Sequence, residues 1–324
     1  MASLMKSLGA VDALDTIQIV LVVIIAVLLA NYIYLRWAMT RQRRLSDWSV
    51  DAEGFANPDD PEGGAGVLGN DTLFDKFYSK VYNDLVDGKV RQGQEVGLTL
   101  SWAKSYRPDV KALKVLDVGC GTGGAVAEFK NAGVQKVIGV DLSDDMISVA
   151  RSSYPKHDYR VGDIGNIALF NAGEFNLVTL FYFTYYYLRD PTQVLHNLYQ
   201  WLAPGGCLVL HLVNREKFDP ILESANPFVA FSPQKYAKNR ISRSKVSFDK
   251  FNYEAEFDHE GDDAEFKEMF KFKNGKVRKQ IHKLKMYTME AIVQAAESAG
   301  FKYKQFIDMT PIGYEYQYLF CFVR

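Results

Sequence analysis

Apolar and polar residues follow three different patterns along the chain. Residues 17–35 form an apolar run without a charged side chain. Residues 36–70 begin with arginines and continue into a stretch rich in Gly, Pro, Asp and Asn without an apolar period, which is typical of a flexible linker. From residue 71 onward apolar residues recur at helical or strand spacing, so we expect a folded body over residues 71–324.

The apolar run is long enough to cross a bilayer. At about 1.5 Å per residue, a helix over residues 17–35 spans a hydrocarbon core of about 30 Å. Arg36 and the arginines within residues 41–44 follow it, so the positive-inside rule predicts an outer tail, residues 1–16, and a cytoplasmic body. A signal peptide would carry its positive charge before the run, and a buried core helix is the other alternative. We therefore expect a single-pass membrane anchor.

The body has the pattern of an α/β fold. Its expected strands are apolar throughout, which indicates a doubly wound parallel sheet covered on both faces. Ligands of such sheets bind at the carboxyl ends of the strands. The expected strands are 115–118, 136–140, 157–161, 175–181 and 207–213, and the expected helices are 73–85, 92–105, 124–132, 144–152 and 192–202.

Residues 214–285 interrupt this alternation and predict an antiparallel β insertion over or beside the strand ends. Asn274-Gly275 is the strongest short hairpin signal, and it separates two strand-like segments, 266–273 and 276–286. The insertion is rich in lysine and aromatic residues, but acidic residues are interleaved with the lysines, which favours a solvated face over a surface for an anionic partner.

Composition excludes several function classes. The 324 residues include 38 basic and 39 acidic side chains, a net charge of −1, so the chain as a whole has no attraction for nucleic acid. Cys120, Cys207 and Cys321 lie far apart and show neither a disulfide framework nor metal-ligand spacing. We therefore expect no metal site.

The segment 115–124, VLDVGCGTGG, is a strand that runs into a glycine-rich turn. Glycines at positions 119, 121 and 123 let the backbone approach a ligand, and the helix that follows offers free N–H groups. A dinucleotide would place its pyrophosphate there. Asp117, inside the strand, would repel a pyrophosphate and suits a cationic group instead, so an NAD-dependent oxidoreductase is the less favoured alternative.

S-adenosylmethionine (SAM) fits the acidic residues around this turn. It carries an ammonium and a sulfonium and no phosphate. Asp141, after the second strand, is positioned to accept hydrogen bonds from ribose hydroxyls, a role that NAD would also use. Asp163, after the third strand, could accept from the adenine amino group.

These motifs resemble those of class I SAM-dependent methyltransferases with a small-molecule-type methyltransferase domain. The matching segments, in order, are 115–123, 140–143, 162–164, 175–178 and 202–210, with Asn176 where the family usually has Asp. The resemblance implies a seven-stranded Rossmann-like sheet whose last strand is antiparallel, with SAM as the cofactor. The cofactor-binding residues expected on this basis are Asp117, Gly119, Cys120, Gly121, Gly123, Asp141, Leu142, Met146, Asp163, Ile164, Phe181 and Tyr182.

The aromatic segment 181–188, FYFTYYYL, should border the sulfonium and the methyl acceptor. Tyr186 and Tyr187 are the candidates for acceptor contact. A hydroxyl or amine acceptor must also lose a proton, which calls for a general base. His211, on an expected strand, is the candidate, although a histidine in a strand, like His282 in the hairpin, is more often packed than catalytic.

The sequence therefore predicts a membrane-anchored SAM-dependent methyltransferase. An anchor raises the effective concentration of a membrane-bound acceptor, which favours a small or lipid-like molecule, with a membrane protein as a further possibility. The rival hypothesis from another class is a non-catalytic SAM-binding or adaptor domain at a membrane.

Overall fold

The computed structural model describes residue 25 and residues 67–86, 88–220 and 240–324. The chain divides into two compact units, residues 1–49 and 50–324, and every element named from here on lies in the second. The predicted tail and membrane anchor, and the linker up to residue 66, lie outside the described residues. No helix in the described part of the chain has the length and apolar character needed to span a bilayer.

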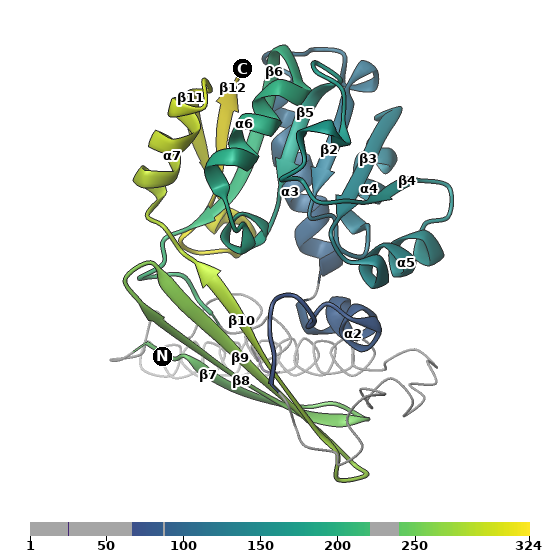
Figure 1. Cartoon of the computed structure of the whole chain (residues 1–324), viewed down its shortest axis with the longest axis vertical. Helices are drawn as coiled ribbons and strands as arrows, with labels where there is room; N and C mark the ends of the chain where they lie inside the picture. The colour runs from purple at the N-terminus through teal and green to yellow at the C-terminus, as the bar shows by residue number, and fades with distance from the viewer. Residues whose placement is uncertain (1–24, 26–66, 87, 221–239) are drawn as a thin grey trace, which may run out of the picture. The chain divides into compact units, whose positions relative to one another are not determined.

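A seven-stranded sheet forms the centre of the second unit, in the order β11-β12-β6-β5-β2-β3-β4 (Figure 1). β12 runs antiparallel to its neighbours β6 and β11, and the other pairs are parallel. The predicted mostly parallel sheet with an antiparallel last strand is thus confirmed. The strands are β2 (Lys114–Val118), β3 (Lys136–Asp141), β4 (Asp158–Val161), β5 (Phe175–Leu180), β6 (Leu202–Val213), β11 (Lys302–Asp308) and β12 (Gln317–Val323).

Helices cover both faces of this sheet because alternate strand residues point to opposite sides. Val115 and Leu177 belong to a buried cluster shared with α3, α4 and α5, whereas Leu116 and Val178 belong to a second cluster shared with α6 and α7. The helices are α2 (Lys76–Val86), α3 (Gly88–Ala103), α4 (Gly124–Asn131), α5 (Asp144–Ser153), α6 (Pro191–Trp201) and α7 (Met289–Ser298).

The predicted insertion supplies four strands of a separate five-stranded sheet, which has the order β1-β10-β9-β8-β7. β7 (Arg243–Ser247), β8 (Phe251–Glu260), β9 (Asp263–Phe272) and β10 (Val277–Lys285) pair antiparallel, as expected, with the turn at Asn274-Gly275. α2 packs on this sheet, where the ring of Phe77 lies 5.2 Å from that of Phe270.

The linker was predicted to extend to residue 70, and the structure corrects this boundary. β1 (Val67–Leu68) pairs in parallel with β10, and the Asn70 side chain donates to and accepts from the Lys283 backbone, at 2.6 and 2.8 Å. A two-residue strand is too short to show an apolar period, so no pattern of residues indicates it.

Lysines on the antiparallel sheet pair with carboxylates on neighbouring strands. Lys267 Nζ lies 2.9 Å from Asp258 Oδ2, and Lys271 Nζ lies 2.9 Å from Glu254 Oε1. Each pair is partly exposed, so it contributes little to stability. This pairing agrees with a solvated sheet face, the interpretation that the sequence favoured.

Candidate active site

A cavity of about 870 Å³ lies at the carboxyl ends of the parallel strands, where the antiparallel sheet and α2 complete its wall. Its lining includes Gly119 after β2, Asp141 at the end of β3, Asp163 after β4, Tyr187 after β5 and His282 on β10. In Figure 1 the antiparallel sheet lies across the carboxyl ends of the central strands. The cavity volume suits a ligand of cofactor size.

The glycine turn follows β2 and forms one wall of this cavity. Gly119 has φ +66°, and a Cβ on it would lie 2.5 Å from Thr184 Cγ2, so both the backbone and the packing require glycine. Of the residues of the turn predicted to bind the cofactor, Gly119, Cys120 and Gly121 line the cavity. Gly123 is not among the lining residues.

Gly123 is required by packing at the start of α4 instead. It precedes the helix with φ +84°, and a Cβ would lie 2.5 Å from the hydroxyl oxygen of Tyr159. That hydroxyl donates to the Gly123 carbonyl oxygen at 3.2 Å. The turn therefore needs this glycine to accommodate a tyrosine from β4, a contact that the motif alone cannot reveal.

Asp141 ties the glycine turn to the loop after β3. Its carboxylate accepts the N–H of Gly121 and that of Ser143, both at 2.9 Å. Burial raises the pKa of Asp141, and the backbone N–H groups of Ser143, Gly121 and Leu142 oppose the shift. A carboxylate has about four acceptor positions, so Asp141 keeps acceptor capacity for a ligand.

Apolar side chains lie beside this carboxylate in the cavity lining. Leu142 is 64% exposed, whereas Met146 on α5 is buried at 2%. Asp163 and Ile164 after β4 complete this part of the wall. The predicted positions from the second and third motifs thus come together at one place.

Asp117 is buried in the cavity wall with a strongly perturbed carboxyl group. It is 2% exposed, and the Thr179 hydroxyl donates to its Oδ1 at 2.8 Å. Burial raises the pKa of Asp117 from its ordinary value of 3.8 to about 7; the Thr179 hydrogen bond opposes the shift, and the charges of Glu95 and Asp141 add to it. A cation bound beside Asp117 would favour its ionised form.

Sequence reasoning missed Arg91, Gln92 and Glu95, which α3 contributes to the cavity lining. Arg91 is 2% exposed, its Nε lies 3.6 Å from Glu95 Oε2, and its guanidinium lies 3.7 Å from the centre of the Tyr182 ring. The sequence does carry one indication of these residues, because Arg91 and Glu95 are four positions apart, the spacing of neighbouring side chains on a helix.

His211 was predicted as the general base, and the structure contradicts that role. It is fully buried and does not line the cavity. Its Nδ1 lies 2.6 Å from Glu95 Oε1 and 3.1 Å from the Tyr182 backbone nitrogen, and its Nε2 lies 3.0 Å from Gln317 Oε1. Both ring nitrogens are engaged inside the core, so His211 holds the loop at Tyr182, whose φ is +53°.

The two tyrosines predicted to contact the acceptor lie in different surroundings, one in the core and one in the cavity lining. Tyr186 is 1% exposed, does not line the cavity, and its hydroxyl accepts the Val213 N–H at 2.8 Å, so it is a core residue. Tyr187 does line the cavity, as do Phe181 and Tyr182. The difference arises because residues 184–187 form a 3-10 turn, η4, in which adjacent side chains point in different directions.

A buried polar cluster lies beside Tyr187 in the antiparallel sheet. The Tyr187 hydroxyl oxygen lies 2.5 Å from His282 Nδ1, and His282 Nε2 lies 2.5 Å from Glu268 Oε2. Glu268 also accepts from the Tyr253 hydroxyl at 2.6 Å and from Gln280 Nε2 at 2.5 Å. His282 lines the cavity, so the histidine passed over in the sequence is the one that the fold brings to the site.

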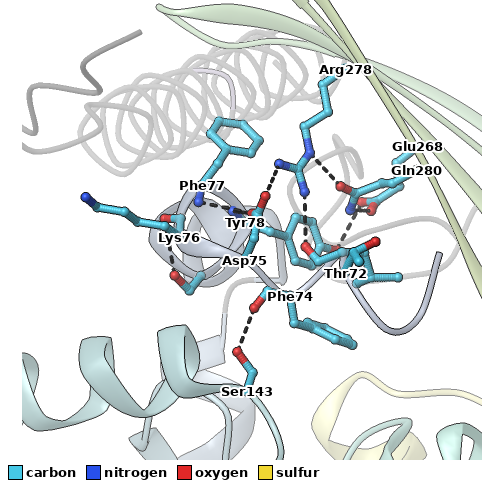
Figure 2. A network of polar contacts seen from close by, with 12 residues as sticks. Thr72, Phe74, Asp75, Lys76, Phe77, Tyr78, Ser143, Glu268, Arg278 and Gln280 are labelled. Carbon is cyan, nitrogen blue, oxygen red and sulfur yellow. Dashed lines mark hydrogen bonds and ion pairs between the residues drawn. The ribbon is translucent and has the colours of Figure 1, made fainter. Parts of the chain in front are cut away.

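The segment before α2 joins this cluster to the glycine-turn side of the cavity (Figure 2). Asp75 begins the helix by accepting the N–H groups of Phe77 and Tyr78, and its other oxygen accepts from Arg278 Nη1 at 2.7 Å. The Ser143 hydroxyl donates to the Phe74 carbonyl oxygen at 2.6 Å. The two sheets are thus fixed relative to each other across the cavity.

Comparison with known proteins identifies the domain that carries this site. Residues 115–206 match the family model described as a methyltransferase domain. The SAM-bound amino pentose methyltransferase of Micromonospora echinaspora has the same fold, with a TM-score of 0.53 and 23% identity, over 72% of this chain and 91% of that one. The chain therefore contains a segment that matches a methyltransferase domain, and it shares the fold of a SAM-bound methyltransferase.

Curated relatives of this methyltransferase domain act on different atoms. A dTDP-4-amino-2,3,4,6-tetradeoxy-D-glucose N,N-dimethyltransferase of Saccharopolyspora spinosa is 31% identical over 43% of this chain and 55% of its own length. A ubiquinone biosynthesis O-methyltransferase of Xanthomonas oryzae is 35% identical over 34% of this chain and 47% of its own. The chain thus spans about half the length of the curated relatives it matches.

We expect Asp117 to make the stability of the methyltransferase domain depend on pH. The pKa of Asp117 is higher in the folded state than in the unfolded state. The contribution of Asp117 to the unfolding free energy is therefore fully present below about pH 4 and is lost as the pH rises through about 7. Relative to Asp117→Asn, wild type should lose up to about 4 kcal/mol of unfolding free energy between pH 4 and pH 8.

Urea unfolding of the ligand-free chain at several pH values, followed by circular dichroism, measures this difference. The exposed Asp158 on β4 provides the control, because Asp158→Asn should leave the pH dependence unchanged. Parallel curves for wild type and Asp117→Asn would contradict the account of Asp117.

Proposed function

We propose that the protein transfers a methyl group from SAM to a small or lipid-like acceptor at a membrane. The observation that carries the proposal is the Asp141 carboxylate, which holds the glycine turn at Gly121 and forms one wall of the cavity with it. The same cavity continues to Tyr187 and His282. One continuous cavity therefore has room for a cofactor and an acceptor.

Several groups of SAM have suitable partners among the residues on the glycine-turn side of the cavity. Asp141 has free acceptor positions for the ribose hydroxyls, and Leu142 offers an exposed apolar surface for the adenine. Asp163 is available to the adenine amino group. Asp117 would pair with the ammonium of SAM, and Arg91 with its carboxylate.

The charge of the lining opposes a dinucleotide. Among the described residues that line the cavity, carboxylates far outnumber the two arginines, Arg91 and Arg189. A pyrophosphate would meet the charges of Asp117 and Asp141 next to the glycine turn, whereas the sulfonium and ammonium of SAM are favoured by them. This balance supports SAM over NAD.

The membrane part of the proposal rests on the sequence. Residues 17–35 would span the bilayer, and the arginines that follow would keep the methyltransferase domain on the cytoplasmic side. Aromatic and apolar side chains in the cavity lining, among them Phe74, Phe266 and Leu284, suit an acceptor with an apolar body. An acceptor dissolved in the membrane fits both features.

We expect the full chain to bind SAM and S-adenosylhomocysteine with micromolar affinity and to show no affinity for NAD. Asp141→Ala removes the charged carboxylate that would accept two hydrogen bonds from the ribose hydroxyls. The affinity for SAM should therefore fall by about 10- to 100-fold. Calorimetric titration of wild type and variant measures this, with Asp158→Ala as the matched control at an exposed carboxylate on β4.

Binding of NAD instead of SAM would contradict the proposal, because it would mean that the turn holds a pyrophosphate. SAM binding without transfer of a tritiated methyl group to any component of a membrane lipid extract would favour the non-catalytic SAM-binding domain.

We also expect the full chain to stay in the membrane pellet after extraction with alkaline carbonate. Replacing Ile24 and Val27 by arginine places two charges at the centre of the apolar run, each costing about 2.5–3.5 kcal/mol of insertion free energy, and should release the protein. The matched control replaces the same two residues by leucine. Release of wild type under these conditions would reject the anchor.

A further inference from the structure

The side chains of Glu268 and His282 form a buried pair beside the cavity, which His282 lines. Glu268 is 3% exposed on β9, and His282 is 2% exposed on the adjacent strand β10. His282 Nε2 lies 2.5 Å from Glu268 Oε2. Because a carboxylate only accepts hydrogen bonds, we assign the ring proton to Nε2, which leaves Nδ1 as an acceptor.

Glu268 is kept ionised by the groups around it. Burial by itself raises the pKa of Glu268, but the interaction with His282, together with hydrogen bonds from Tyr253 and Gln280, outweighs burial and holds the pKa below its ordinary value. Apolar residues can often replace a buried ion pair without loss of stability. The pair therefore calls for a functional explanation.

Tyr187 links His282 to the open part of the cavity. Its hydroxyl oxygen lies 2.5 Å from His282 Nδ1. Burial raises the pKa of Tyr187 well above its ordinary value, so the phenol keeps its proton and donates it to Nδ1. A tyrosine that lines the cavity thus leads to a histidine, and the histidine leads to a buried carboxylate.

The 3-10 turn η4 directs this chain of groups toward the glycine turn. Thr184 and Tyr187 are its first and last residues, and side chains three positions apart in a 3-10 helix lie on the same face. Thr184 lies against Gly119, so closely that a Cβ there would meet Thr184 Cγ2 at 2.5 Å. Tyr187 is therefore next to the part of the cavity where the sulfonium of SAM would lie.

The titratable groups around the Glu268–His282 pair come from three other elements. Tyr78 on α2 lies 3.4 Å from His282 Nε2, Tyr187 is on η4, and Tyr253 on β8 donates to Glu268. Burial raises the pKa of all three phenols well above the ordinary value, so they remain neutral. His282 Nδ1 is the basic nitrogen that faces Tyr187.

Aromatic rings surround the histidine on the cavity side. The ring of Phe74 lies 5.9 Å from that of His282 and the ring of Phe266 lies 5.6 Å from it, both edge to face. Such a wall excludes water and suits an apolar or aromatic body. The polar end of the acceptor would then face Tyr187.

We propose that Tyr187, His282 and Glu268 form a proton relay for methylation of a phenol-type hydroxyl, an inference that rests on the proposed function. The acceptor oxygen forms a bond to the methyl carbon as the S–CH₃ bond of SAM breaks, which leaves neutral S-adenosylhomocysteine. The acceptor O–H proton passes to Tyr187, whose own proton passes to His282 Nδ1. Glu268 stabilises the resulting imidazolium, and the proton returns to solvent after product release.

A neutral amine acceptor would not need this relay, because its nitrogen lone pair attacks before any proton leaves. The test therefore compares two probes of matched shape, 4-hexylphenol and 4-hexylaniline, each with the full chain and SAM labelled in the methyl group. The variants are His282→Gln and Tyr187→Phe, and the exposed His196 on α6 gives the matched control His196→Gln. SAM affinity is measured for each by calorimetry.

The relay predicts that wild type methylates the phenol and that its rate falls on acidification. His282→Gln should lower kcat for the phenol by about 100-fold or more and abolish this acid limb, with SAM affinity unchanged. Tyr187→Phe removes a single oxygen and should also lower kcat. If His282→Gln fails to fold, the kcat of Tyr187→Phe tests the relay in its place. His196→Gln should behave as wild type.

The outcomes separate the relay from the proposed function. Failure of wild type to bind SAM would reject the proposed function and the relay with it. SAM binding with labelling of the amine alone, or of neither probe, would reject the relay alone. Phenol methylation that keeps its rate and acid limb in both relay variants would also overturn it.

Discussion

The buried carboxylate of Glu268 fixes the antiparallel sheet against the rest of the domain. An ionised group in this position is tolerated only with a full set of donors, because an uncompensated buried charge costs several kcal/mol. Those donors come from β8, β10 and α2, through Tyr253, His282 and Tyr78. Their positions in turn set the wall of the cavity opposite the glycine turn.

Asp141 has the corresponding role on the other side of the cavity. It accepts the N–H groups of Gly121 and Ser143, so the turn after β2 and the loop after β3 share one carboxylate. Ser143 then donates to the Phe74 carbonyl oxygen, and Asp75 accepts from Arg278 on the antiparallel sheet. A continuous set of polar contacts thus connects the cofactor side with the acceptor side.

The central sheet could be predicted because local signals specify it. Apolar strands that end in glycine or aspartate, such as the one before Gly119 and the one ending at Asp141, mark the ligand edge of the sheet. Most of the predicted cofactor positions consequently line one cavity. The exception, Gly123, faces Tyr159, a contact that only the tertiary structure creates.

The acceptor side could not be predicted in the same way, because its residues lie far apart in sequence. His282 and Tyr187 are about 95 positions apart, and His282 meets Tyr187 only because the insertion folds across the strand ends. His211 and His282 are both buried histidines on strands, so only their partners and their position relative to the cavity distinguish them. Periodicity likewise says nothing of which neighbouring tyrosine, Tyr186 or Tyr187, points into the cavity.

A structure of the protein with S-adenosylhomocysteine would show whether one cavity brings the cofactor's sulfur next to Tyr187. We predict ribose hydroxyls on Asp141 and a sulfur atom that faces the Tyr187 hydroxyl, with room between them for an acceptor oxygen at about 3–3.5 Å from the transferred methyl carbon. A ribose away from Asp141, or a sulfur atom that faces away from Tyr187, would contradict the account.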